Sequence, residues 1–208
     1  MIISFDGNVF SGKTYFINTL SKSRDFNPIA EHSFFIDKVS NNLFSSNKFL
    51  SQQKRYLEVD ALRKKYIRES KINLIDRSFV SLSAHVLALF KCGIADIRTD
   101  YIKLLQKYLN GDRIIIPDYY VFIYSPLEIS RRRFANDTKR GTEILYLDKN
   151  YFEAVELFNR KWVGLAPGKI IDKVNYKCLN IQEIDKNAKK IGKKEIILMT
   201  KEIFDKVL

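Results

Sequence analysis

The sequence predicts an α/β protein built on a five-stranded parallel sheet with helices on both faces. One observation is that short apolar runs alternate along the chain with longer segments of helical periodicity. The other is that several short runs are apolar on successive residues, as expected of strands that helices cover on both faces. Parallel strands of this kind need right-handed crossovers, and ligands bind beyond their carboxyl ends.

The strand candidates are short runs rich in β-branched and aromatic residues. They lie at residues 2–5, 29–30 with their flanks, 72–75, 119–124 and 176–180. Helical patterns occupy residues 12–21, 49–69, 79–90, 98–108, 127–134, 149–162 and much of 184–208. Because no repeat or linker interrupts this alternation, we expect a single domain over residues 1–208.

Composition and charge restrict the class of protein without deciding its function. A hydrophobic content of 46% is typical of a globular chain rather than a disordered one. The sequence has no apolar run of about 18 residues and no signal-peptide pattern at its start. We therefore expect a cytoplasmic protein with no membrane partner. The net charge of +12 attracts anions, which suits nucleotides and nucleic acids equally.

A glycine-containing segment between the first strand pattern and the first helical pattern matches the Walker A motif in full. Glycines let the backbone turn its N–H groups towards phosphate oxygens, and the helix N-terminus adds partial positive charge. Lys13 can reach the β- and γ-phosphates of ATP, and the Thr14 hydroxyl can ligate Mg²⁺. This motif predicts a P-loop NTPase fold. The expected phosphate-binding residues are Gly7, Asn8, Val9, Phe10, Ser11, Gly12, Lys13 and Thr14.

An acidic residue and a basic residue, Asp76 and Arg77, follow the third apolar run. A carboxylate at a strand end beside the P-loop can hold the hydration shell of Mg²⁺, and a neighbouring arginine can neutralise phosphate charge. The DxxG and NKxD elements of GTPases are absent after the loop, as is an LSGGQ-like ABC signature. The sequence therefore favours another P-loop class, with Thr14 and Asp76 as the Mg²⁺ ligands.

Residues 5–14 resemble the P-loop of the deoxynucleoside kinases, in which Gly-Asn and an apolar residue open the loop. Residues 76–78, Asp-Arg-Ser, resemble the Glu-Arg-Ser motif of that family, and thymidylate kinases have Asp-Arg at this place. Residues 124–133 are similar to the strand that leads into the arginine-rich lid of these kinases. We place the lid at about residues 131–145. The likeness spans roughly residues 1–162.

The resemblance implies roles at the acceptor side of the site. Glu31 stands where those kinases carry a Glu-Pro pair, so it would be the base that takes the proton of the acceptor hydroxyl. Gln53, or Gln52 beside it, would hydrogen-bond the nucleobase through its amide. Tyr56 could stack on that base, although aromatic residues at helical spacing are more often part of a core. Arg77 would also contact the substrate.

The resemblance further implies that cations offset charge on the transferring phosphoryl group. From the lid, Arg132 would be catalytic and Arg140 would bind ATP phosphate, beside Lys13 in the loop. The two histidines have plainer interpretations. A lone loop histidine such as His32 is usually solvated, and His85 lies on an apolar helix, where it is expected to pack.

Three functions remain open at this point. The first is an ATP- and Mg²⁺-dependent kinase that transfers the γ-phosphate to the 5′-hydroxyl of a (deoxy)nucleoside. The second is a thymidylate kinase-like enzyme, whose phosphate acceptor fits the net charge and the Asp76-Arg77 pair. The third is a nucleic-acid-binding protein or polynucleotide 5′-kinase. The Gly7-Asn8 start of the loop and the placement of Glu31 favour the first, with nucleic acid not an expected partner. Base preference, sugar preference and a homodimer stay open.

Overall fold

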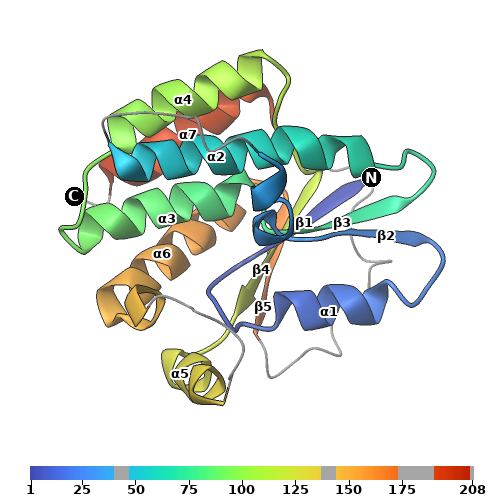
Figure 1. The fold of residues 1–208 in the computed structure, drawn as a ribbon, viewed down its shortest axis with the longest axis horizontal. Coiled ribbons are helices and arrows are strands. Elements are labelled where there is room, and N and C mark those ends of the chain that lie inside the picture. Colours follow the sequence, from blue (N-terminus) through green and yellow to red (C-terminus); the bar gives the residue numbers. More distant parts are fainter. Residues whose placement is uncertain (40–46, 137–143, 173–189, 207–208) are drawn as a thin grey trace.

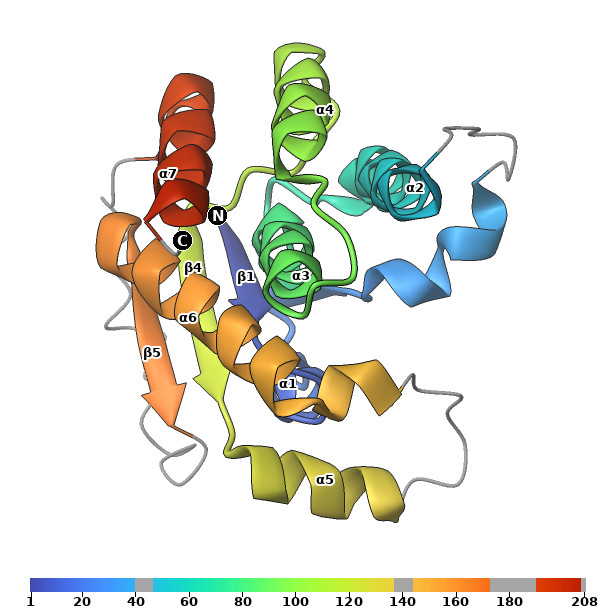
Figure 2. The same ribbon diagram turned by 90° about the vertical axis from the view of Figure 1, so that its left-hand side faces the viewer.

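The computed structural model describes residues 1–39, 47–136, 144–172 and 190–206 (Figures 1 and 2). Its centre is a parallel sheet of five strands in the order β2-β3-β1-β4-β5, which confirms the predicted α/β class. The strands are β1 (Ile2–Asp6), β2 (Phe26–Ile29), β3 (Ile72–Asp76), β4 (Tyr119–Tyr124) and β5 (Gly168–Asp172).

Helices cover both faces of the sheet, as predicted. Figure 1 shows α1 on one side of the strands and α2, α3, α4 and α7 on the other, and Figure 2 shows α5 beyond the end of β4. The α-helices are α1 (Lys13–Leu20), α2 (Lys48–Arg63), α3 (Phe79–Lys91), α4 (Arg98–Asn110), α5 (Leu127–Ala135), α6 (Lys149–Leu165) and α7 (Lys193–Asp205). Short 3-10 helices are η1 (His32–Phe34), η2 (Ile36–Lys38), η3 (Lys64–Tyr66) and η4 (Ile144–Leu147).

Two apolar clusters hold these layers together. The smaller one joins α1 to the sheet through Phe16 and Ile17. The larger one lies between the sheet and the opposite helices, and at its centre is the fully buried Trp162, whose ring stacks on Phe158 at 6.1 Å. In the part of the chain that the structure describes, no helix has both the length and the apolar character needed to span a membrane.

The sheet edge strands differ from their predicted bounds. The structure places the fifth strand at Gly168–Asp172, whereas the predicted run at 176–180 lies outside the described residues. The β5 segment was missed because its only strongly apolar residues are Ile170 and Ile171. At the other edge, β2 runs from Phe26 to Ile29 and contains Pro28, which an edge strand tolerates.

The register of the central strands brings the predicted motifs to one end of the sheet. Phe5 of β1 pairs with Asp76 of β3, and Ile29 of β2 pairs with Ile75. Because all strands are parallel, their carboxyl ends meet at the same edge. The segments that begin at Gly7, Ala30 and Arg77 therefore leave the sheet side by side.

Candidate active site

The segment from Gly7 to Thr14 curls between β1 and α1 as a phosphate-binding loop requires. Gly7 has φ +139°, and a Cβ atom at that position would lie 2.5 Å from the backbone oxygen of Ile123. Gly12 has φ +97° and caps α1. Phe10, at φ +57°, is the loop's non-glycine residue in the left-handed region. Backbone geometry therefore requires both glycines, and close packing also requires Gly7.

Lys13 is buried, and its ammonium group lies inside the curl of the loop. Its Nζ donates to the backbone oxygens of Gly7 at 3.1 Å and Asn8 at 2.6 Å, and to Ser11 Oγ at 3.1 Å. Burial, followed by the charge of Arg77, lowers the pKa of Lys13 to about 7. Phosphate oxygens would offer this ammonium a charged partner and favour its protonated form. The loop thus fits a polyphosphate such as that of ATP.

Thr14 and Asp76 meet next to the loop. The Thr14 hydroxyl donates to Asp76 Oδ2 at 2.5 Å, while the buried Asp76 Oδ1 has no hydrogen-bond partner among the described residues. A hydroxyl and a carboxylate are oxygen ligands of the kind that Mg²⁺ prefers. The unpaired buried oxygen is what a hydrated cation would satisfy, so these residues fit Mg²⁺.

Arg77 and Glu31 form an ion pair at the carboxyl ends of β3 and β2. Arg77 Nε donates to Glu31 Oε2 at 3.3 Å, and its Nη1 donates to the backbone oxygen of Gly7 at 3.3 Å. The other oxygen of Glu31 accepts from Ser33 Oγ at 2.7 Å. Although burial opposes its charged form, the carboxylates of Glu31 and Asp76 raise the pKa of Arg77. One guanidinium therefore links the loop to both strand ends.

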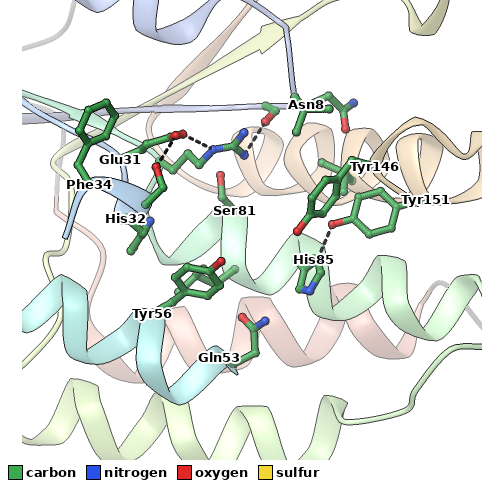
Figure 3. A pocket seen from close by; sticks show the side chains of 16 residues that line it. Asn8, Glu31, His32, Phe34, Gln53, Tyr56, Ser81, His85, Tyr146 and Tyr151 are labelled. Carbon is green, nitrogen blue, oxygen red and sulfur yellow. Dashed lines mark hydrogen bonds and ion pairs between the residues drawn. The ribbon is translucent and has the colours of Figure 1, made fainter. Parts of the chain in front are cut away.

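A cavity of about 660 Å³ opens from this ion pair and extends between α2 and α3 (Figure 3). Gln53 and Tyr56, both predicted to bind substrate, line it from α2. Gln53 is fully buried, and neither its amide nitrogen nor its amide oxygen has a hydrogen-bond partner among the described residues. Of the two neighbouring glutamines it is thus Gln53 that faces the cavity with unused hydrogen-bonding capacity.

His85 was expected to pack, and its ring does contact those of Tyr146 and Tyr151, but it also lines the cavity. Its Nδ1 is hydrogen-bonded to the Tyr151 hydroxyl, and Tyr146 lies beside both rings (Figure 3). Burial, followed by the charge of Arg77, lowers the pKa of His85 to about 4, so its imidazole is neutral at physiological pH. The sequence did contain a signal for the position of His85 at the cavity. Ser81 and His85 are four residues apart, so these two polar residues share one face of the largely apolar α3.

The three arginines at the start of the predicted lid point in different directions from α5. Arg133 Nη1 donates to the backbone oxygen of Phe10 in the phosphate loop, and Arg131 Nη2 donates to that of Leu147 at 3.0 Å. Arg132, the predicted catalytic residue, is exposed. The helix therefore turns Arg133 rather than Arg132 towards the loop. Arg140 lies outside the described residues.

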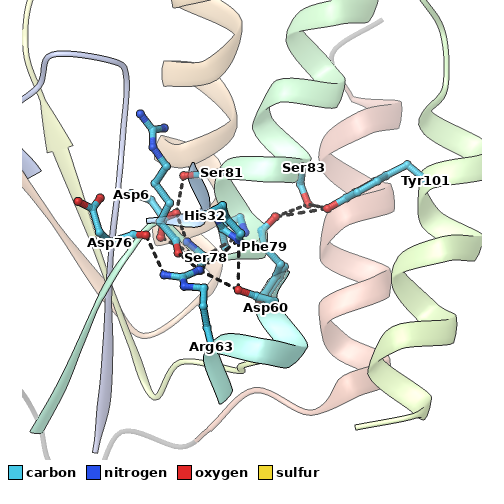
Figure 4. Close-up of polar contacts among 12 residues, drawn as sticks. Asp6, His32, Asp60, Arg63, Asp76, Ser78, Phe79, Ser81, Ser83 and Tyr101 are labelled. Carbon is cyan, nitrogen blue, oxygen red and sulfur yellow. Dashed lines mark hydrogen bonds and ion pairs between the residues drawn. The ribbon is translucent and has the colours of Figure 1, made fainter. Parts of the chain in front are cut away.

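Two buried acidic residues support the site from beneath (Figure 4). Asp6 accepts hydrogen bonds from the Ser78 backbone N–H at 2.9 Å and from the Ser81 hydroxyl at 2.6 Å, which fixes the start of α3 against β1. Asp60 Oδ1 lies 3.1 Å from His32 Nε2. His32 is only 3% exposed, so the expectation of a solvated loop histidine is wrong.

Comparison with known proteins identifies the fold. No family model matches the chain, and no curated protein matches it either. Among solved structures, a deoxyadenosine kinase from M. mycoides with bound dATP is similar over 100% of this chain and 99% of that one, with a TM-score of 0.61 and 14% identity. A thymidylate kinase from Candida albicans is similar over 92% and 94%, with a TM-score of 0.59 and 18% identity. The resemblance predicted from the motifs is confirmed for the fold, which is that of these P-loop kinases.

Proposed function

We propose that this protein is an ATP-dependent nucleoside kinase that transfers the γ-phosphate of ATP to the 5′-hydroxyl of a (deoxy)nucleoside. The observation that carries the proposal is the position of Glu31. Its carboxylate lies where the phosphate loop meets the cavity, within 3.3 Å of Arg77 Nε, and both residues line that cavity. A base for a hydroxyl acceptor belongs at such a junction.

Five residues of the site have roles in this reaction. Glu31 takes the proton of the 5′-hydroxyl as the bond from that oxygen to the γ-phosphorus forms and the bond to the β-phosphate oxygen breaks. Arg77 orients Glu31 and offsets charge on the phosphoryl group, while Lys13 binds the phosphates. Mg²⁺ held through Thr14 and Asp76 would neutralise charge on the nucleotide phosphates.

The charges of the cavity favour a neutral acceptor over a nucleoside monophosphate. Arg77 is the one lysine or arginine among the described cavity-lining residues, and Glu31 already pairs with it. The low pKa of His85 keeps that imidazole uncharged. A phosphate dianion in this cavity would have to share one cation with Glu31. The unpaired amide of Gln53 and the ring of Tyr56 suit a nucleobase, which pairs by hydrogen bonds and stacks.

A thymidylate kinase-like activity is the second candidate. The similarity to the thymidylate kinase structure and the Asp76-Arg77 sequence favour it, as does the net charge of +12. Its acceptor oxygen belongs to a phosphate, which ionises without help and needs cations more than a base. The two candidates therefore differ in their dependence on Glu31.

The test is a panel of nucleosides and nucleoside monophosphates with ATP and Mg²⁺, run on the protein and on its Glu31→Gln variant. We expect transfer to nucleosides, with kcat lowered by about 100-fold or more in the variant and the Kd for ATP unchanged. Glu58→Gln is the matched control, because Glu58 also pairs with an arginine, Arg113, but does not line the cavity. Full-rate transfer by Glu31→Gln would exclude the proposed base. Transfer to monophosphates alone would select the second candidate, and bound ATP without any transfer would refute a kinase.

A further inference from the structure

Three ionisable side chains form a buried cluster next to the site (Figure 4), and one of them, His32, also lines the cavity. Arg63 and Asp60 of α2 are fully buried, and His32 of η1 is 3% exposed. Arg63 Nη1 donates to Asp60 Oδ1 at 2.8 Å and lies 3.1 Å from His32 Nε2. Although burial opposes it, the His32 hydrogen bond and the charge of Arg63 hold the pKa of Asp60 below its usual value. Burial, followed by the charge of Arg63, lowers the pKa of His32.

The guanidinium of Arg63 also binds the backbone on which the proposed reaction depends. Its Nη2 donates to the carbonyl oxygen of Asp76 at 2.8 Å, and its Nη1 donates to that of Arg77 at 2.9 Å. Arg77 has φ +65°, a left-handed conformation that is costly for a residue with a side chain. A planar fork of donors can hold two successive carbonyls at this turn, which a single ammonium cannot do.

The same cluster reaches the second strand end. His32 follows Glu31 directly, and its ring is fixed by Asp60 at 3.1 Å and by edge-on packing against Tyr56 at 5.7 Å. The cluster therefore contacts the chain next to Glu31 and the chain at Arg77, the two partners of the ion pair described above.

Stabilisation of the fold does not by itself explain why these three side chains are buried together. A buried ion pair loses its hydration, and well-packed apolar side chains of similar volume often stabilise a fold as well or better. What apolar side chains cannot do is hold the carbonyls of Asp76 and Arg77 in a strained turn.

We propose that Arg63 is a positioning residue which, with Asp60 and His32, sets the geometry of Glu31, Asp76 and Arg77 for phosphoryl transfer. The inference rests on the proposed function. Arg63 acts through the backbone of the β3 end and touches neither nucleotide nor acceptor. Its loss should misplace reacting groups by a fraction of an ångström to an ångström, and such errors lower the rate of the chemical step more than they weaken binding.

The first test is Arg63→Lys, which keeps the charge beside Asp60 but loses the fork. We expect kcat to fall by about 10-fold to 100-fold, while the KM for ATP and the fraction of molecules that bind ATP stay within about twofold of the unmodified protein. Arg98→Lys is the matched control. Arg98 also donates to an aspartate, Asp96, at 2.9 Å and to a backbone oxygen, that of Phe204, at 3.2 Å, but it lies on α4 away from the site. The kcat of the Arg98→Lys variant should not change.

The second test is the double variant Asp60→Leu with Arg63→Met, which leaves no unpaired buried charge and is expected to fold. It should bind ATP with an unchanged Kd and show the same loss of kcat. If either variant keeps the full kcat per ATP-binding site, Arg63 does not position the site. If neither variant yields protein that binds ATP, the cluster serves the fold itself, and the proposal is overturned. An unmodified protein that phosphorylates no acceptor would instead refute the proposed function, so the two failures are distinct.

Discussion

His85 should make the folded protein less stable in mild acid, because its imidazole is enclosed beside the cavity. Its pKa is about 4 in the folded protein, against 6.5 for a free histidine. Between these values the unfolded chain binds more protons than the folded one, so the free energy of unfolding rises with pH and its full value is reached above pH 6.5. From these two pKa values, acidification from pH 7 to pH 5 costs about 2 kcal/mol through this one residue.

The variant His85→Gln removes the titrating group and keeps a polar side chain for Tyr151. Urea unfolding, followed by the fluorescence of the single tryptophan, should show that the wild type loses about 2 kcal/mol more than the variant over this pH range. Proton NMR offers an independent check, since the chain has only two histidines and the variant identifies the signal of His85. The inference that His85 is enclosed and neutral would be refuted by a measured pKa near 6.5. It would also be refuted if the free energies of unfolding of the two proteins changed in parallel with pH.

Two further predictions concern the cation site and the sheet edge. Thr14→Val removes the hydroxyl that lies 2.5 Å from Asp76 Oδ2, so the Mg²⁺ concentration for half-maximal activity should rise by about tenfold; a Mg²⁺ titration that superimposes on the wild type would count against Thr14 as a ligand. Gly168→Ala places a Cβ atom 2.5 Å from the backbone oxygen of Tyr120, so the Tm measured by calorimetry should fall by at least about 3 °C, and an unchanged Tm would contradict the pairing of β5 with β4.

The parts of the site that lie within one continuous segment were predictable. The phosphate loop is encoded by its own residues, because glycines, a lysine and a threonine must stand at fixed spacing between a strand and a helix. Asp76 and Arg77 were found for the same reason, since they end an apolar strand. Weak local patterns did not predict the element that they form. The fifth strand has two strongly apolar residues, and its edge position left one of them, Ile170, 38% exposed.

Which side chain of a helix faces the site depends on how that helix is docked, and a sequence does not carry this information locally. Arg132 and Arg133 are adjacent arginines that the sequence alone does not distinguish. Only the rotation of α5 about its axis turns Arg133 to the phosphate loop. The helix that carries His85 is apolar, and such a sequence predicts packing rather than a place at the site. Its partner hydroxyl comes from Tyr151, 66 residues further along the chain.

By itself, then, the sequence determined the alternation of strands and helices, the phosphate loop and the acidic strand end, because each depends on neighbours in the chain. Tertiary structure alone decided that Glu31 pairs with Arg77 across 46 residues and that Gln53 keeps an unpaired amide in the cavity. It also decided that Arg63 holds the carbonyls of the turn at Arg77. These relations join groups that only the packing of α2 and α3 against the sheet brings within hydrogen-bonding distance.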